Sequence, residues 1–140
     1  MSFFMYKSFF CVCCVLGLVR GYAQDATYEF TGKHFLTSYV HCKPCALMDC
    51  VQLRKVMVQA AQEAGAQVLD VLEYQFEGGG YTLVLLLAES HASIHTYPEV
   101  SACFVDFFTC GDRCSVELFD QRLSAYLQAD KQNQQLILRK

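Results

Sequence analysis

The sequence predicts a two-layer α/β (α+β) domain in which helices cover one face of a largely antiparallel sheet. Strand-like apolar runs alternate with two segments of helical spacing, and Glu77-Gly78-Gly79-Gly80 joins two of the runs as a hairpin turn would. The resulting order, β-α-β-β-β-α-β, suits a sheet with its helices on one face. A length of 140 residues allows one domain with a substantial core.

The first half of the domain contains one expected strand and one expected helix. Residues 30–40 form the strand, and its apolar members are Phe35, Tyr39 and Val40. A turn at residues 42–45 leads into the helix, because proline is tolerated in a first helical turn. The helix is expected to run to about Ala64 and to stop at Gly65. Its expected core face consists of Leu47, Val51, Val58 and Ala61.

Three further strands are expected at residues 68–76, 81–88 and 103–109. The run at 81–88 is apolar on both faces, which predicts a central strand covered on both sides. A second helix follows, with Ser115 as its cap and apolar positions at helical spacing. Those positions are Val116, Phe119, Leu123, Tyr126 and Leu127. Residues 130–135 are expected to be a polar connection, and residues 136–138 a short edge strand.

Composition limits the classes of partner. Apolar residues make up 54% of the chain and charged residues 18%, which predicts a globular protein. The net charge is -3 and the chain has no run of lysines or arginines. Nucleic acid and anionic membrane are therefore not expected as principal partners.

The first 24 residues differ from the rest. Lys7 precedes an apolar segment at residues 8–19, and small residues at 21–23 would suit a signal peptidase. The apolar run is too short to span a bilayer comfortably and Arg20 interrupts it, so no stable membrane partner is expected. Residues 1–24 are thus either a secretory signal peptide or an extension ahead of a domain at 28–140.

The nine cysteines fall into three groups, at residues 11–14, 42–50 and 103–114. An odd number leaves at least one cysteine unpaired, and a domain this large and apolar does not need a disulfide scaffold. We therefore predict reduced thiols. Cys103 and Cys114 are expected to be small buried hydrophobic residues.

The residues that can carry chemistry lie between two apolar runs. The stretch from Glu89 to Glu99 follows the run 83–88, and the run 102–108 ends on Thr109-Cys110-Gly111-Asp112. Serine, two histidines, two glutamates and a cysteine thus occur within about two dozen residues. We expect two buried strands to bring these side chains to their ends.

The order of these residues resembles a known signature. Glu-Ser-His-x-x-Ile-His-Thr-x-Pro-Glu at 89–99, followed by Phe-Thr-Cys-Gly at 108–111, is similar to the small prokaryotic S-adenosylmethionine decarboxylases, which are pyruvoyl-dependent. The similarity extends from about Thr31 to Leu127. It implies the S-adenosylmethionine decarboxylase-like fold and the conversion of S-adenosylmethionine to CO2 and the aminopropyl donor for spermidine synthesis.

The resemblance implies that the chain is a zymogen that cuts itself at Glu89-Ser90. Ser90 would become a pyruvoyl group that forms a Schiff base with the substrate amine, leaving a β chain (1–89) and an α chain (90–140). His95 matches the histidine that removes the α proton during processing, and a near-neutral pKa suits that role. Thr82 stands where the family usually has a second processing serine. His91 receives no assigned role.

The resemblance also assigns residues that act on the substrate. Cys110 matches the general acid that reprotonates the product carbon, a task for which a thiol pKa can be tuned. Glu99 matches the acid that binds the ribose hydroxyls, and Phe76 matches an aromatic residue that stacks on the adenine. Ordinary core packing is the alternative for Phe76. Arginine and ornithine remain as alternative substrates.

A second alternative is a non-catalytic, thiol-rich or metal-binding module. Cys42-x-x-Cys45, with His41 and Cys50, has a spacing that can serve redox exchange or zinc binding. A second Cys-x-x-Cys pair is missing, so no metal site is predicted. The family resemblance further implies a homodimer of processed αβ pairs, with active sites at the interface, in the cytoplasm. The N-terminal apolar segment would permit export instead.

Overall fold

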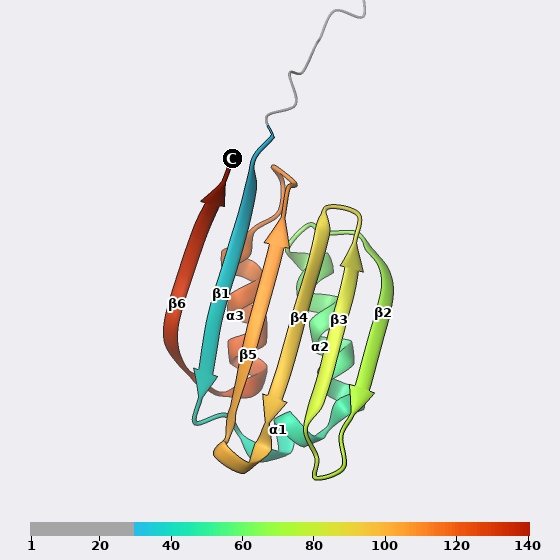
Figure 1. Cartoon of the computed structure of the whole chain (residues 1–140), viewed down its shortest axis with the longest axis vertical. Helices are drawn as coiled ribbons and strands as arrows, with labels where there is room; N and C mark the ends of the chain where they lie inside the picture. The colour runs from blue at the N-terminus through green and yellow to red at the C-terminus, as the bar shows by residue number, and fades with distance from the viewer. Residues whose placement is uncertain (1–29) are drawn as a thin grey trace, which may run out of the picture.

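The computed structural model describes residues 30–140, so the predictions for residues 1–24 lie outside the described residues. One six-stranded sheet, in the order β2-β3-β4-β5-β1-β6, is paired antiparallel throughout and carries its helices on one face (Figure 1). The predicted fold class is confirmed. The elements are β1 (Gly32–Val40), α1 (Pro44–Met48), α2 (Cys50–Glu63), β2 (Val68–Gln75), β3 (Tyr81–Leu87), β4 (Ser90–Tyr97), the 3-10 turn η1 (Pro98–Val100), β5 (Ala102–Thr109), α3 (Val116–Leu127) and β6 (Asp130–Arg139).

The core fills the space between the sheet and the helices α2 and α3. Alternate residues of each central strand point into it, as the two-residue period of a strand requires. The strand side of the core includes Phe35, Tyr39, Leu83, Leu85, Ile94, Val105 and Phe107. Phe107 stacks on Phe119 of α3 with ring centroids 4.4 Å apart, which fixes that helix over β5. The predicted cap of α3 is confirmed, because the Ser115 side chain accepts a hydrogen bond from the Leu118 N–H.

The helix expected from Pro44 to Ala64 is two helices. Asp49 breaks the run and caps α2, its carboxylate accepting a hydrogen bond from the Gln52 N–H at 2.9 Å. The predicted core face is confirmed for Leu47 and Ala61, which are buried, and for Val58, which packs against the core, but it was wrong for Val51, which is 68% exposed. The buried residues of α2 are Leu53, Met57, Ala60 and Ala61. The stop at Gly65 is confirmed, with φ at +94° just after the helix.

Residues 90–97, for which no strand was predicted, form the strand β4. Ala92, Ile94 and Thr96 point into the core, and the polar residues between them point away. Because half of its residues are polar, the segment does not look like a strand in the sequence. The expectation that residues 81–88 are covered on both faces was wrong. Leu86 is 53% exposed, since helices cover only one face of the sheet.

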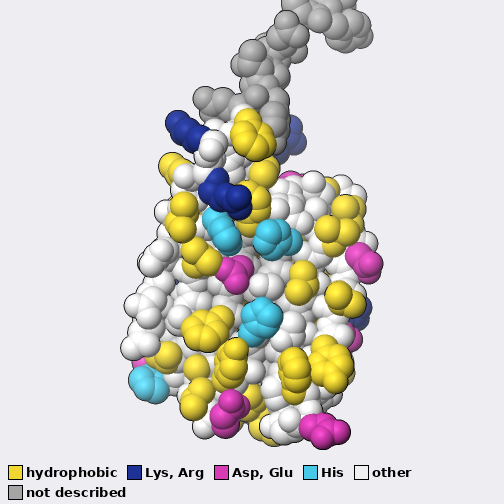
Figure 2. All heavy atoms as spheres, in the orientation of Figure 1, with side chains coloured by type: hydrophobic (Ala, Val, Ile, Leu, Met, Phe, Trp, Pro, Cys, Tyr) yellow, Lys and Arg dark blue, Asp and Glu magenta, His cyan; other side chains and the backbone are white. Residues whose placement is uncertain are grey.

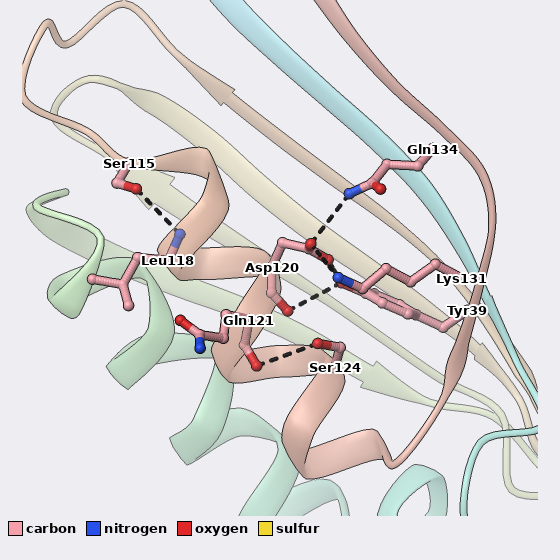
Figure 3. Close-up of polar contacts among 8 residues, drawn as sticks. All are labelled: Tyr39, Ser115, Leu118, Asp120, Gln121, Ser124, Lys131 and Gln134. Atoms are coloured by element: carbon pink, nitrogen blue, oxygen red, sulfur yellow. Dashed lines mark hydrogen bonds and ion pairs between the residues drawn. The ribbon is translucent and has the colours of Figure 1, made fainter.

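The C-terminal segment is a ten-residue edge strand rather than a polar connection and a short strand. It pairs with β1 along its length. Asp120 of α3 is buried and accepts hydrogen bonds from Lys131 Nζ at 2.5 Å and from Gln134 Nε2 at 3.1 Å, as well as from the hydroxyl of Tyr39 (Figure 3). These contacts tie the polar half of β6 and β1 to the helix layer.

The face of the sheet opposite the helices is open to solvent. Hydrophobic side chains are spread over it, with histidines among them (Figure 2). Its exposed apolar residues include Leu72, Tyr74, Phe76, Leu86 and Phe104. Exposed apolar residues on several strands of one sheet face are typical of a surface that meets another molecule.

Candidate active site

Ser90 lies at the turn between β3 and β4. Leu87 and Ser90 are paired, so Ala88 and Glu89 alone form the turn. The φ of Ser90 is +152°, a backbone conformation that favours glycine. The nitrogen of the peptide bond predicted to be cut therefore belongs to a residue with a strained backbone.

The carbonyl group of Glu89 is held by the neighbouring strand. Ser90 pairs with Thr109 of β5, which places the backbone N–H of Cys110 beside the turn. That N–H donates a hydrogen bond to the Glu89 carbonyl oxygen at 3.0 Å. The Glu89 carboxylate accepts another from the Gln67 N–H at 3.0 Å. The Glu89 carbonyl is thus fixed, and its oxygen faces a donor that could stabilise negative charge.

His91 contacts the serine directly. Its Nδ1 lies 3.1 Å from Ser90 Oγ. Its ring meets His34 and Phe108 at centroid distances of 6.4 and 5.7 Å. The turn therefore presents a hydroxyl, an imidazole and a fixed carbonyl within one small region.

Four of the predicted site residues line a separate cleft with a volume of about 470 Å³: Phe76, Thr82, His95 and Glu99. Thr82 Oγ1 and His95 Nδ1 are 2.9 Å apart. Phe76 is 51% exposed and stands edge-on to Tyr74, which rules out core packing as its role. Its ring is free to meet a ligand in the cleft.

The serine and the cleft lie at opposite ends of β4. In Figure 1 the β3–β4 turn is at the top, and the β2–β3 turn and η1, which border the cleft, are at the bottom. His95 is five residues beyond Ser90 on the same strand. At 3.3–3.4 Å per residue this separation is roughly 17 Å. The expected gathering of these side chains does not occur within one protomer.

The three cysteines of the alternative metal or redox group differ in burial. Cys42 is buried, Cys45 is exposed and Cys50 is half-buried. Contact with Cys42, together with burial, raises the pKa of Cys103, so Cys42 faces another buried thiol instead of its CxxC partner. Within residues 30–140, no group of three or more histidine, cysteine, aspartate or glutamate side chains could hold a metal ion. Cys103 and Cys114 are buried, as predicted.

Two features of the site were missed from the sequence. The role of the Cys110 backbone N–H could not be predicted from the sequence, because it depends on the pairing of β4 with β5. His34, whose Nε2 lies 3.6 Å from Asp106 Oδ1, reaches the serine region from β1, more than fifty residues earlier in the chain. The alternation of residues 90–97 is the one sequence signal that could have revealed the register.

The arrangement of sheet and helices has a solved counterpart. The crystal structure of the adenosylmethionine decarboxylase from Aquifex aeolicus VF5 superimposes with a TM-score of 0.67 and 28% sequence identity, over 77% of this chain and 88% of that chain. The class defined by the fold is therefore the α+β fold of that decarboxylase.

Sequence comparison narrows the class to a family. The S-adenosylmethionine decarboxylase family model matches residues 33–140. An S-adenosylmethionine decarboxylase proenzyme of Parasynechococcus marenigrum (strain WH8102) is 45% identical over 61% of this chain and 67% of its own length. One of Synechococcus sp. (strain WH7803) is 43% identical over 70% of this chain and 77% of its own length. The chain belongs to the S-adenosylmethionine decarboxylase family. Across residues 30–140, no helix combines the length and apolar character needed to cross a membrane.

Proposed function

We propose that this chain is a proenzyme that cuts itself between Glu89 and Ser90 and then decarboxylates S-adenosylmethionine. Membership of the family supports this activity and its place in polyamine synthesis. The observation that carries self-cleavage is the backbone of Ser90, strained at φ +152°, next to a carbonyl that accepts a hydrogen bond from the Cys110 N–H. The family resemblance implies the cytoplasm, where the nucleoside substrate is made, so we place the enzyme there.

The first step suits the geometry of the turn. Attack of Ser90 Oγ on the Glu89 carbonyl carbon places negative charge on the oxygen, which the Cys110 N–H already faces. The amide becomes an ester. The backbone strain at Ser90 raises the free energy of the amide and so favours its conversion to the ester. Loss of the Ser90 α proton then eliminates the Glu89 carboxylate. His95 is the proposed base for this loss, and Thr82, hydrogen-bonded to it, the proposed helper.

The residues present fit a group built at position 90. A pyruvoyl group formed from Ser90 supplies the electron sink that no side chain offers for a carbanion at the substrate α carbon. Cys110 is half-buried beside that position, and its thiol is the proposed donor of the proton to the product carbon.

The cleft provides the proposed nucleoside site. Phe76 presents an accessible aromatic ring, and Glu99 presents a carboxylate at the same cleft. A ring that can stack on adenine and an acceptor for two ribose hydroxyls are what an S-adenosyl substrate requires. This pair favours S-adenosylmethionine over arginine or ornithine, which have no nucleoside.

A complete site needs a second copy of the chain. A base must lie within hydrogen-bond reach of the proton it removes, about 3 Å, and His95 is far outside that reach from Ser90 of its own protomer. Two open sheet faces packed about a two-fold axis would bring the cleft of one protomer to the turn of the other. Such packing would also cover the exposed apolar residues of that face. We therefore propose a homodimer of processed αβ pairs with shared sites.

Complementation between two inactive variants tests this proposal. Ser90→Ala and His95→Ala should each stay uncut when expressed alone. In a mixed dimer, the His95→Ala chain supplies Ser90 and the Ser90→Ala chain supplies His95, so the His95→Ala chain should be cut. An uncut mixture that contains mixed dimers would show that the site is not shared.

Release of CO2 tests the substrate. Carboxyl-labelled S-adenosylmethionine, arginine and ornithine are supplied to the processed protein and to Ser90→Ala. We expect label only from S-adenosylmethionine and only with the processed protein. Release from arginine or ornithine instead would move the assignment to another amino acid decarboxylase.

A further inference from the structure

We propose that His91 is the base that removes the hydroxyl proton of Ser90 in the first step of self-cleavage. The proposal rests on the function proposed above and concerns a step for which that account names no base. His95 is the proposed base for the later removal of the Ser90 α proton, so His91 and His95 would act in succession.

Within one protomer, the distances favour His91 over the other histidines. Its Nδ1 lies 3.1 Å from Ser90 Oγ, within hydrogen-bond reach. His95 is roughly 17 Å further along β4, and its Nδ1 is engaged with Thr82. His34 turns its Nε2 toward Asp106. Within one protomer, His91 is thus the histidine whose ring nitrogen meets the attacking hydroxyl.

Aromatic rings of two other strands flank the exposed ring of His91. It is opposite Phe108 in the pairing of β4 with β5, and both rings meet His34 of β1. Arg139 of β6 lies over Phe108, 4.5 Å from the ring centroid, and supports that ring from the next strand but one. The titratable and charged groups around His91 are therefore His34, Asp106 and Arg139.

The step balances in atoms and protons. The bond from Ser90 Oγ to the Glu89 carbonyl carbon forms, while the hydroxyl proton passes to Nδ1 of neutral His91. The bond from that carbon to the Ser90 nitrogen then breaks, and the proton passes from His91 to the leaving nitrogen. The product is an ester with a free amine, and His91 is neutral again. No oxidant or outside reactant is needed.

Hydroxylamine distinguishes this step from the later elimination, because it cleaves an ester and leaves an amide intact. Purified wild type, His91→Gln, His91→Ala and His95→Ala are followed by intact mass with and without hydroxylamine. His41→Gln is the matched control, since His41 is an exposed histidine paired with Asp130. The melting temperature of each His91 variant is compared with that of wild type, and a variant that retains the native fold is used for the test.

The proposal predicts that the folded His91 variant is cut about 100-fold or more slowly and resists hydroxylamine, because it remains an amide. His95→Ala should stay uncut but split at 89–90 with hydroxylamine, and His41→Gln should be cut like wild type. A folded His91 variant that is cut at the wild-type rate overturns the proposal. So does one that accumulates a hydroxylamine-sensitive ester. An uncut wild type would instead contradict self-cleavage itself.

Discussion

At the scale of single residues, Cys110 serves the site in two ways. Its backbone N–H donates to the Glu89 carbonyl, the proposed target of attack during processing, and its thiol is the proposed acid in catalysis. Only the second contribution depends on the side chain. A substitution at this position should therefore separate self-cleavage from turnover.

Cys110→Ala should cut itself normally but turn over on the order of 100-fold more slowly, which is what a general acid typically contributes. Its activity should also decay early, because misplaced protonation converts the ketone at position 90 into an amine. Intact mass measures the cut, and CO2 release measures turnover. Cys45→Ser, at an exposed thiol, is the control and should match wild type. Full and lasting activity in Cys110→Ala would exclude the thiol as the acid.

Tyr39 couples stability to alkaline pH. Burial, and then the hydrogen bond to Asp120, raise the pKa of Tyr39 well above its ordinary value. Burial also raises the pKa of Tyr81 and of Tyr126. An unfolded tyrosine ionises near pH 10 and the folded one does not, so the native state binds more protons there. The stabilisation is present below that pH and is lost as the pH rises above it.

The free energy of unfolding should therefore fall above about pH 10, by at most about 1.4 kcal/mol per pH unit for each such tyrosine. Tyr39→Phe should be less stable at pH 8, by about 1.5–3 kcal/mol for a hydrogen bond to a charged group. Its further loss toward pH 11 should be shallower than in wild type. Urea unfolding at several pH values measures both effects. Equal slopes for the two proteins would contradict this account of Tyr39.

The sequence proposes chemical roles for single residues but does not report their positions. The order of residues in the signature indicated Ser90, His95 and Cys110 without any structure, because each needs a particular side chain. Their placement depends on pairing across strands, which no local pattern of residue types reports. His34 illustrates this limit, since only the register of β1 against β5 brings it toward the serine.

At the scale of elements, local signals succeeded where the backbone is constrained. Glycines after β2, the cap at Ser115 and the stop at Gly65 all fell where predicted. The strand β4 was missed because its exposed positions carry polar side chains and resemble a loop. The first half of β6, at residues 130–135, was missed because an edge strand needs little apolar sequence when its neighbour pairs with its backbone.

Asp49 offers a test at this scale. Asp49→Ala removes the cap of α2 and should lower the free energy of unfolding by about 1 kcal/mol. Asp49→Asn keeps an oxygen that can accept from the Gln52 N–H, so it should lose much less. Chemical denaturation measures both variants. If Asn proved as costly as Ala, the hydrogen bond would not be the source of the stabilisation.

At the scale of the whole molecule, the open sheet face explains why the site is divided. One helix layer covers one face, and the other face carries both the serine turn and the cleft at its two ends. With the residue roles proposed above, neither end is complete alone. Pairing of two such faces would both bury apolar surface and assemble two equivalent sites.

Leu86→Lys should disrupt this pairing without harming the fold, because Leu86 is already half exposed on the open face. The variant should be monomeric by light scattering and remain uncut. Val51→Lys places the same charge on an exposed position of α2, in the helix layer, and should remain dimeric and cut itself. A Leu86→Lys protein that is dimeric and fully cut would place the interface elsewhere.

The most direct test of the central claim is the intact mass of the purified protein, measured with and without S-adenosylmethionine and cyanoborohydride. Self-cleavage and the proposed substrate together predict two chains separated between Glu89 and Ser90, the second of which gains a mass derived from the substrate. A single uncut chain that gains no mass would contradict the account.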